Sequence, residues 1–244
     1  MLARTFQHLP GIGPRAEAKL WEQGITHWDR FVRARKVPGI GTARKAYLDR
    51  HLRADQQALA YEEWERFTTW PLTLHHRALP HLERIMYLDI ETYGVRESRV
   101  TLIALSDGEH LEIIDGTRAD RDLLEQRLTP AQAIVTFNGN RFDLPYLARA
   151  YAYRPCCFRI DLEPLCTRIG LSGGLKRIER EIGIERDQQL AAGDPLALWR
   201  SYRATEDAHF LELLTAYIEQ DVRSLPVLLE KVLRTGEPLS GSLP

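Results

Sequence analysis

The sequence predicts an α/β fold: a mixed five-stranded sheet flanked by helices and preceded by a small all-α domain. Two observations indicate this fold. Short apolar stretches with the character of strands lie between residues 87 and 162, and the first three follow one another directly, whereas the last two are separated by helical stretches. The first 53 residues instead alternate glycine-proline turns with helix-forming segments.

Length and composition indicate an ordinary globular chain. It has 244 residues, 44% apolar and 27% charged, which suffices for one large and one small domain. Because it lacks a run of about eighteen apolar residues and an apolar secretion signal, we expect a soluble, cytoplasmic protein with no membrane partner. Cys156, Cys157 and Cys166 predict reduced thiols, since their spacing fits neither a disulfide framework nor a zinc site.

Two copies of Pro-Gly-Ile-Gly, at residues 10–13 and 38–41, each precede a basic helix-forming segment. Backbone amides of a glycine turn that opens a helix can hold a phosphate. The arrangement resembles the helix-hairpin-helix motif of DNA repair and replication proteins, which contacts the sugar-phosphate backbone without reading bases. The alternative is an ordinary turn in a helical bundle. The predicted contacts are Gly11, Gly13, Gly39, Gly41, Arg44 and Lys45.

The charges are unevenly distributed. Residues 1–80 hold 13 Lys and Arg against 8 Asp and Glu, whereas the remainder holds 20 against 26. This division suits an N-terminal part that binds an anionic polymer, although a basic run can also be a solvated helix face.

Residues 54–84 are expected to form a helix, Ala54 to Phe67, and a linker. The linker contains His75, His76 and His81. They predict a connector rather than a metal site, because no carboxylate or cysteine is spaced around them as a partner. The expected division is therefore 1–53, a nucleic-acid-binding domain; 54–84, helix and linker; 85–235, the α/β domain; and 236–244, a flexible tail.

The stretch Tyr87 to Thr92 predicts a strand with two acids on one side. Side chains alternate along a strand, so Asp89 and Glu91 share a face opposite Leu88 and Ile90. Two adjacent carboxylates on an apolar strand are costly unless a cation lies between them. Hard cations such as Mg²⁺ and Mn²⁺ prefer oxygen ligands.

The following elements complete the sheet. Residues 100–106 and 110–115 predict strands joined at Asp107-Gly108, a hairpin signal. Helices are expected at 121–128 and 142–152, and strands at 133–138 and 158–162. This order is similar to that of a ribonuclease-H-like sheet.

Two further acids stand at informative positions. Asp143, in Asn138-Gly-Asn-Arg-Phe142-Asp143, lies where a strand passes into a helix. Asp221 lies in a helix expected from Asp207 to Leu233, within its apolar stripe, and Tyr217 is one turn earlier on the same side. Alone, each has a structural interpretation: a helix cap for Asp143, with Asn140 as a competitor, and a core acid for Asp221.

The decapeptide 138–147 resembles the second exonuclease motif of family B polymerase proofreading domains, where the Asp shares a metal site with the Asp-x-Glu pair. Asp89, Glu91, Asp143, Asp221 and Tyr217 together resemble the DEDD exonuclease superfamily, tyrosine subtype; the histidine subtype would have His where this chain has Ala216. The whole chain is similar to the YprB-like family of ribonuclease-H-like proteins.

This resemblance implies a 3′-5′ exonuclease that hydrolyses phosphodiester bonds of single-stranded nucleic acid, with DNA favoured over RNA. Two Mg²⁺ or Mn²⁺ ions would be held by Asp89, Glu91, Asp143 and Asp221, and Tyr217 would orient the attacking water. Thr92, Asn138 and Phe142 are expected beside the substrate. No motif indicates a protein partner.

Two functional alternatives and the roles of four residues stay open. One is a structure-specific endonuclease on branched DNA, and another is a catalytically weak nucleic-acid-binding module. Asp161 either joins the site or caps a helix. Lys176, Arg177 and Arg180 either border the substrate channel or face solvent.

Overall fold

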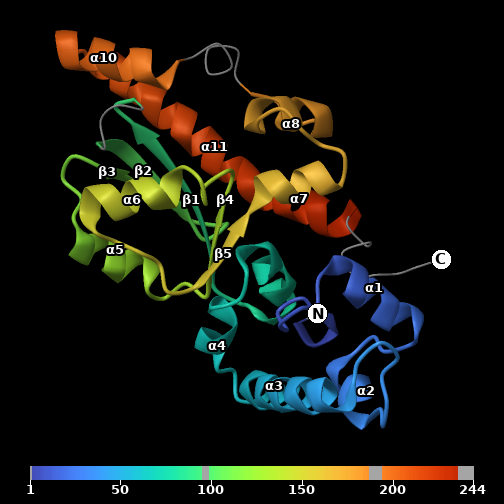
Figure 1. Cartoon of the computed structure of the whole chain (residues 1–244). Helices are drawn as coiled ribbons and strands as arrows, with labels where there is room; N and C mark the ends of the chain where they lie inside the picture. The colour runs from blue at the N-terminus through green and yellow to red at the C-terminus, as the bar shows by residue number, and fades with distance from the viewer. Residues whose placement is uncertain (1, 95–98, 187–193, 236–244) are drawn as a thin grey trace. The chain divides into compact units, whose positions relative to one another are not determined.

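The computed structural model describes residues 2–94, 99–186 and 194–235. The chain divides into two compact units, the first holding Met1–Leu82 and the second Glu83–Gly236 (Figure 1). The predicted tail, 236–244, lies outside the described residues.

Among its described residues, the regular secondary structure of the first unit is helical, apart from one isolated β-bridge between Val37 and Ile40. Its elements are η1 (Leu2–Arg4), α1 (Pro14–Glu22), α2 (Trp28–Arg33), α3 (Thr42–Ala60), α4 (Trp64–Thr68) and η2 (Leu72–His81). The core contains fully buried aromatic side chains, among them Phe6, Trp28 and Phe31. The indole of Trp28 also donates a hydrogen bond to the backbone oxygen of Thr5 over 2.6 Å, which satisfies its buried polar atom.

The prediction of a helix from Ala54 to Phe67 is wrong. Helix α3 begins at Thr42 and continues without a break to Ala60, and α4 follows after a short turn. Residues 42–60 contain neither glycine nor proline, so nothing in the sequence stops the helix near residue 53. Leu48 and Leu52, one turn apart, are both fully buried and hold the helix against the core.

The second unit contains a mixed five-stranded sheet in the order β3-β2-β1-β4-β5. The strands are β1 (Ile85–Thr92), β2 (Val100–Ser106), β3 (Leu111–Asp115), β4 (Ala133–Thr136) and β5 (Phe158–Asp161). Strands β1, β2 and β3 pair antiparallel, and β4 pairs parallel to both β1 and β5. The predicted fold class is confirmed.

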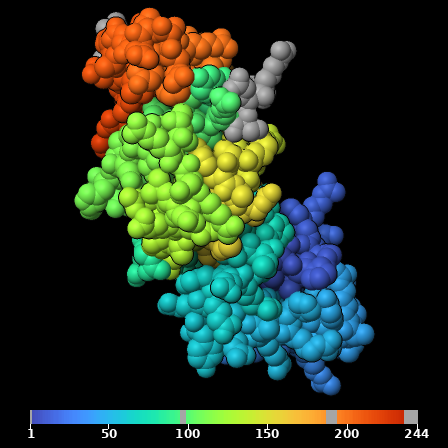
Figure 2. Space-filling view, turned by 90° about the vertical axis from the view of Figure 1, so that its left-hand side faces the viewer, coloured from blue at the N-terminus to red at the C-terminus, as the bar shows by residue number. Residues whose placement is uncertain are grey.

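Helices cover both faces of this sheet. On one face, α5 (Arg121–Leu128) and α6 (Asp143–Tyr151) pack Leu124, Leu128 and Leu147 against Leu88 and Ile90 of β1. In Figure 2, the yellow-green side chains of this region form a continuous surface. Long helix α11 (Ala208–Thr235) passes behind the sheet in Figure 1. The remaining helices are α7 (Leu162–Arg168), α8 (Leu175–Ile182) and α10 (Pro195–Thr205).

Helix α11 is the longest of the described helices, with 28 residues. Neither it nor any other helix in the described ranges combines the length and apolar character needed to cross a membrane.

Candidate active site

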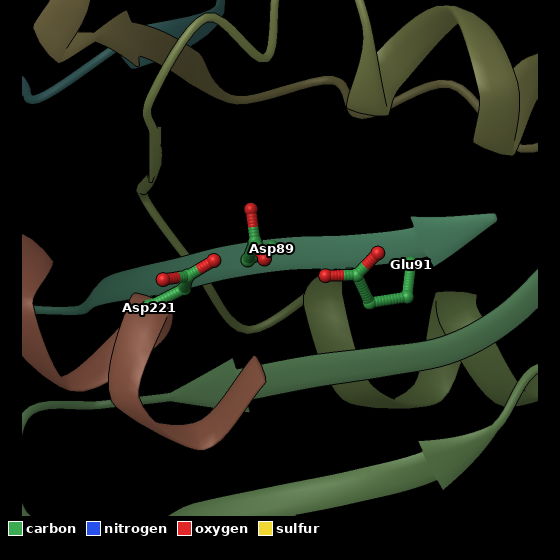
Figure 3. A group of neighbouring side chains, drawn as sticks. All are labelled: Asp89, Glu91 and Asp221. Carbon is green, nitrogen blue, oxygen red and sulfur yellow. The ribbon is translucent and has the colours of Figure 1, made fainter. Parts of the chain in front are cut away.

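Three carboxylates meet on the sheet face that α11 covers. Leu88 and Ile90 point into the core shared with α5 and α6, so Asp89 and Glu91 project from the opposite side of β1. Helix α11 brings Asp221 to them, and one carboxylate oxygen of each acid lies within 4.8 Å of the others (Figure 3). Within the described ranges, this is the sole cluster of three or more His, Cys, Asp or Glu side chains spaced to hold a metal ion.

The fourth predicted acid, Asp143, is the first residue of α6 and is 2% exposed. One of its oxygens accepts a hydrogen bond of 3.0 Å from the backbone N–H of Ile90, the residue between Asp89 and Glu91. Asp143 therefore touches the backbone of the strand that carries the other acids. It is not part of the three-carboxylate cluster.

Asp161 fixes the loop that leads to Asp143. Its carboxylate accepts hydrogen bonds from the backbone N–H groups of Asn138 (2.7 Å) and Asn140 (3.2 Å), and it caps α7 through Glu163 N–H. Asn138 has a positive φ of 62°, and a Cβ on Gly139 would lie 2.3 Å from the Thr136 hydroxyl oxygen. The loop thus needs glycine at position 139 and the Asp161 carboxylate to hold its shape.

Burial and mutual repulsion make the cluster hard to ionise. Burial, followed by the negative charges of Asp143 and Asp221, raises the pKa of Asp89 well above its ordinary value. Burial and the charges of Asp221 and Asp143 raise the pKa of Glu91 to about 8. Burial raises the pKa of Asp221 to about 6, although Arg186 opposes the shift. A divalent cation removes this cost, and a donor set made only of carboxylate oxygens suits Mg²⁺ or Mn²⁺.

Tyr217 lies beside the acids and between two cations. It is 7% exposed, with the ammonium nitrogen of Lys176 4.5 Å and the guanidinium carbon of Arg186 5.7 Å from its ring centroid. Burial, followed by the charges of Asp221 and Glu91, raises the pKa of its phenol above the ordinary value of 10. At neutral pH the phenol therefore keeps its proton and can donate a hydrogen bond.

Arg186 is a site residue that the sequence analysis misses. Its side chain is 4% exposed and donates to Oδ1 of Asp221 and to both oxygens of Glu179, with an Nη2 to Oε1 distance of 2.8 Å. One signal was available in the sequence. Leu175, Ile178, Glu179 and Ile182 form one helical stripe, and an acid in such a stripe needs a cationic partner.

The three residues predicted beside the substrate lie at the ends of the elements that carry the acids. Thr92 is the last residue of β1, Asn138 follows β4, and Phe142 precedes α6. All three are half-buried. The ring of Phe142 lies 4.7 Å from that of Tyr146, centroid to centroid, which leaves it packed against its own helix.

In the first unit, the two glycine turns have matching conformations. Gly11 and Gly39 both have positive φ, 71° and 79°, and Gly13 and Gly41 directly precede α1 and α3, whose first turns lack a side-chain cap. Arg44 links the turns, because its guanidinium donates to the Gly11 backbone oxygen over 3.0 Å.

Lys45 behaves differently from the prediction that groups it with these turns. It is 7% exposed, and its ammonium donates to both carboxylate oxygens of Asp49, one turn later, at 2.9 and 2.7 Å. The same nitrogen lies 5.3 Å from the ring centroid of Phe31. The charge of Lys45 is thus paired with that of Asp49 within the first unit.

A cavity of about 480 Å³ opens where β1 ends. Tyr93, two residues beyond Glu91, lines it together with Tyr151 of α6 and Trp199 of α10, and two arginines, Arg99 and Arg203, border it. Trp199 is 5% exposed, and its indole N–H makes no hydrogen bond within the described residues. The cavity is thus lined by aromatic rings and bordered by two arginines.

Comparisons with known proteins agree with this fold. The family model of the RNase H superfamily matches residues 86–233. DNA polymerase 2 of Aeropyrum pernix is 28% identical over 192 residues, which cover 64% of this chain and 24% of the polymerase, so the chain spans about a quarter of that relative's length.

Two solved structures are also similar. The family B DNA polymerase of the archaeon Pyrobaculum calidifontis is 23% identical, with a TM-score of 0.49, over 62% of this chain and 24% of the polymerase. RNase D of Escherichia coli, an exoribonuclease involved in structured RNA processing, is 26% identical, with a TM-score of 0.47, over 71% of this chain and 44% of RNase D.

Proposed function

The chain belongs to the RNase H superfamily, and on that premise we propose that it is a metal-dependent 3′-5′ exonuclease of the DEDD type, tyrosine subtype. The observation that carries this proposal is the meeting of Asp89, Glu91 and Asp221 within 4.8 Å of one another. Three acids from two distant stretches of chain converge on one point, although their repulsion is unfavourable. Binding of Mg²⁺ or Mn²⁺ gives a physical reason for that convergence.

Each acid has a distinct part in the proposed site. When bound, divalent ions would stabilise charge on the scissile phosphate and lower the pKa of the attacking water. Asp89 and Glu91 would supply oxygen ligands from β1, and Asp221 would supply one from α11. Asp143 accepts a hydrogen bond from Ile90 N–H, and its negative charge raises the pKa of Asp89, so it would favour ion binding through its charge. The protonated phenol of Tyr217 orients the attacking water by donating a hydrogen bond.

The cavity beyond Glu91 supports single-stranded nucleic acid as the substrate. Single strands are held by aromatic rings that stack on bases and by cations along the backbone. Tyr93 and Tyr151 provide rings, and Arg99 and Arg203 provide positive charge. DNA is favoured over RNA because the relative in Aeropyrum pernix is a DNA polymerase.

The paired turns of the first unit support a second nucleic-acid contact. We propose that residues 9–53 form a YprB-like pair of helix-hairpin-helix motifs. The exposed backbone around Gly11 and Gly39, each beside an uncapped helix start, offers N–H groups to phosphates. Arg44 holds the two turns together, so they can grip one backbone as a unit.

The same paired turns favour one rival function, a structure-specific endonuclease on branched DNA. An end-blocking assay separates the two. Single-stranded oligonucleotides with either the 3′ or the 5′ end blocked are incubated with the full chain and Mn²⁺, beside a branched duplex. An exonuclease of the proposed polarity stops at the 3′ block and ignores the 5′ block. Cleavage of the branched duplex, together with cleavage of the oligonucleotides that neither block prevents, would establish the endonuclease instead.

A further inference from the structure

The guanidinium of Arg186 contacts one of the acids that are proposed to bind metal. It donates to Oδ1 of Asp221, one of the three carboxylates proposed to hold the ions. The contact is buried, since the Arg186 and Asp221 side chains are 4% and 12% exposed. Removal of one partner from a buried ion pair of this kind is far more costly than removal of one partner from a surface ion pair.

Glu179 anchors the guanidinium independently of the metal cluster. It is fully buried, with an exposed fraction of 0%, and its two oxygens accept from Nε and Nη2 of Arg186. Loss of the contact with Asp221 therefore does not release Arg186 from the site. The remaining nitrogen, Nη1, is buried and makes no hydrogen bond in the part of the chain that the structure describes.

We propose that Arg186 is a built-in cation that competes with one divalent ion for Asp221. This inference rests on the proposed metal-binding function of the cluster. The three carboxylates lie around one point, so an ion held by all of them must first displace the guanidinium from Asp221. The affinity of the site for that ion is therefore lower than the carboxylates alone would give.

Two consequences follow from this competition. In the metal-free protein, Arg186 compensates the charge of Asp221, so that α11 can bury this acid next to Asp89 and Glu91. When an ion takes Asp221, one N–H of Nη2 is released while Nη2 stays bonded to Glu179, and Nη1 is already without a partner among the described residues. Guanidinium donors of this kind are suited to a phosphate oxygen. Arg186 is thus a positioning residue for Asp221.

Binding of Mn²⁺, followed by electron paramagnetic resonance of the free ion, tests this directly and without activity. Arg186→Gln alone would leave Glu179 buried and unpaired, so the informative variant is the double exchange Glu179→Gln with Arg186→Gln, which replaces the ion pair by two amides. Arg186→Lys keeps the positive charge but loses the planar guanidinium and its several N–H donors. Arg180→Gln, an exposed arginine on α8, is the matched control. Thermal unfolding without metal confirms that each variant is folded.

Wild type and Arg180→Gln are expected to bind Mn²⁺ with the same affinity, since both keep the buried charge pair that the ion must break. In the double variant the affinity for Mn²⁺ should rise about tenfold or more, and Arg186→Lys lies between these cases.

Unchanged or weaker binding of Mn²⁺ in the double variant would overturn the competition while leaving the proposed nuclease intact. If none of these proteins, wild type included, binds Mn²⁺, the metal centre itself is refuted, and the role of Arg186 is refuted with it.

Discussion

At the scale of single residues, Asp89 is an acid at which burial and the charges of neighbouring carboxylates combine. Its pKa is raised by burial and by three neighbouring carboxylates, Asp143, Asp221 and Glu91. Such an arrangement disfavours the metal-free fold and favours a bound cation. An amide of the same shape would avoid this repulsion, so the position of Asp89 indicates a chemical role.

Asp89→Asn is therefore expected to separate stability from activity. It removes a metal ligand and should lower metal-dependent cleavage about a hundredfold or more. Because it also removes a repelled charge, the melting temperature without metal should stay the same or rise. Asp122→Asn, an exposed acid on α5, is the control and should change neither quantity. Full activity in Asp89→Asn would count decisively against the proposed metal site.

The pKa of Glu91 predicts how metal-free stability depends on pH. The value is about 8 in the folded protein against an ordinary 4.5, so between these pH values the fold holds a proton that the unfolded chain has released. The free energy of unfolding in EDTA should therefore fall as the pH rises across that interval. Mn²⁺ must displace the same proton, so its affinity should rise over the interval. Thermal unfolding and Mn²⁺ titration at pH 6 and pH 8 measure both trends.

Glu91→Gln cannot ionise and provides the control for this pH dependence. Both trends should be flatter in the variant than in the wild type. Identical slopes in the two proteins would mean that Glu91 does not bind the proton that the metal displaces.

Tyr217→Phe should affect turnover more than substrate binding. The phenol is kept protonated by its surroundings, and its proposed role is to orient water during reaction. We expect kcat to fall about tenfold or more while KM changes little. Tyr202→Phe on α10 is the control. Equal losses in kcat and in substrate affinity would indicate that Tyr217 is structural.

At the scale of elements, the loop between β4 and α6 decides where Asp143 lies. Asp161 holds this loop through backbone N–H groups, so Asp161→Ala should lower the free energy of unfolding by about 2 kcal/mol and displace Asp143. Activity should fall as well. Asp120→Ala, which removes the cap of α5 at Leu123 N–H, should cost about 1 kcal/mol and leave cleavage unchanged. Cleavage at the wild-type rate in Asp161→Ala would show that Asp143 does not depend on the loop.

The strands of the sheet could be predicted because their signal is local. Alternation in Tyr87 to Thr92 places Asp89 and Glu91 on one face whatever surrounds them. Helices were less certain. No helix is predicted at 195–205, although Asp194 and Pro195 are start signals and the Asp194 carboxylate accepts from Leu196 N–H over 3.0 Å.

Contacts between distant stretches could not be predicted in the same way. Arg186 meets Asp221 across 35 positions in the sequence, and nothing near either residue specifies the other. The partner of Lys45, by contrast, could be predicted, because Asp49 lies one helical turn later in the sequence. The prediction grouped Lys45 with the glycine turns as a phosphate contact and did not consider this ion pair.

At the scale of the whole molecule, we propose that the first unit binds nucleic acid and that the second unit hydrolyses it. Thr42→Glu tests the first assignment. An acid at the first residue of α3 favours the helix but repels a phosphate at the Gly41 turn. Affinity for a single-stranded oligonucleotide, followed by fluorescence anisotropy, should fall about tenfold, and its salt dependence should become shallower.

Gln57→Glu adds the same charge at an exposed position on the same helix, away from the turn, and is the matched control. It should weaken binding far less. Equal losses in both variants would mean that only net charge matters and that the glycine turns do not contact the backbone.

The most direct test of the account is anomalous diffraction from crystals of the full chain soaked in Mn²⁺. We predict an anomalous peak within ligand distance of Asp89, Glu91 and Asp221. A soaked crystal in which Mn²⁺ binds only elsewhere, with these three carboxylates free of any peak, would contradict the proposed nuclease site.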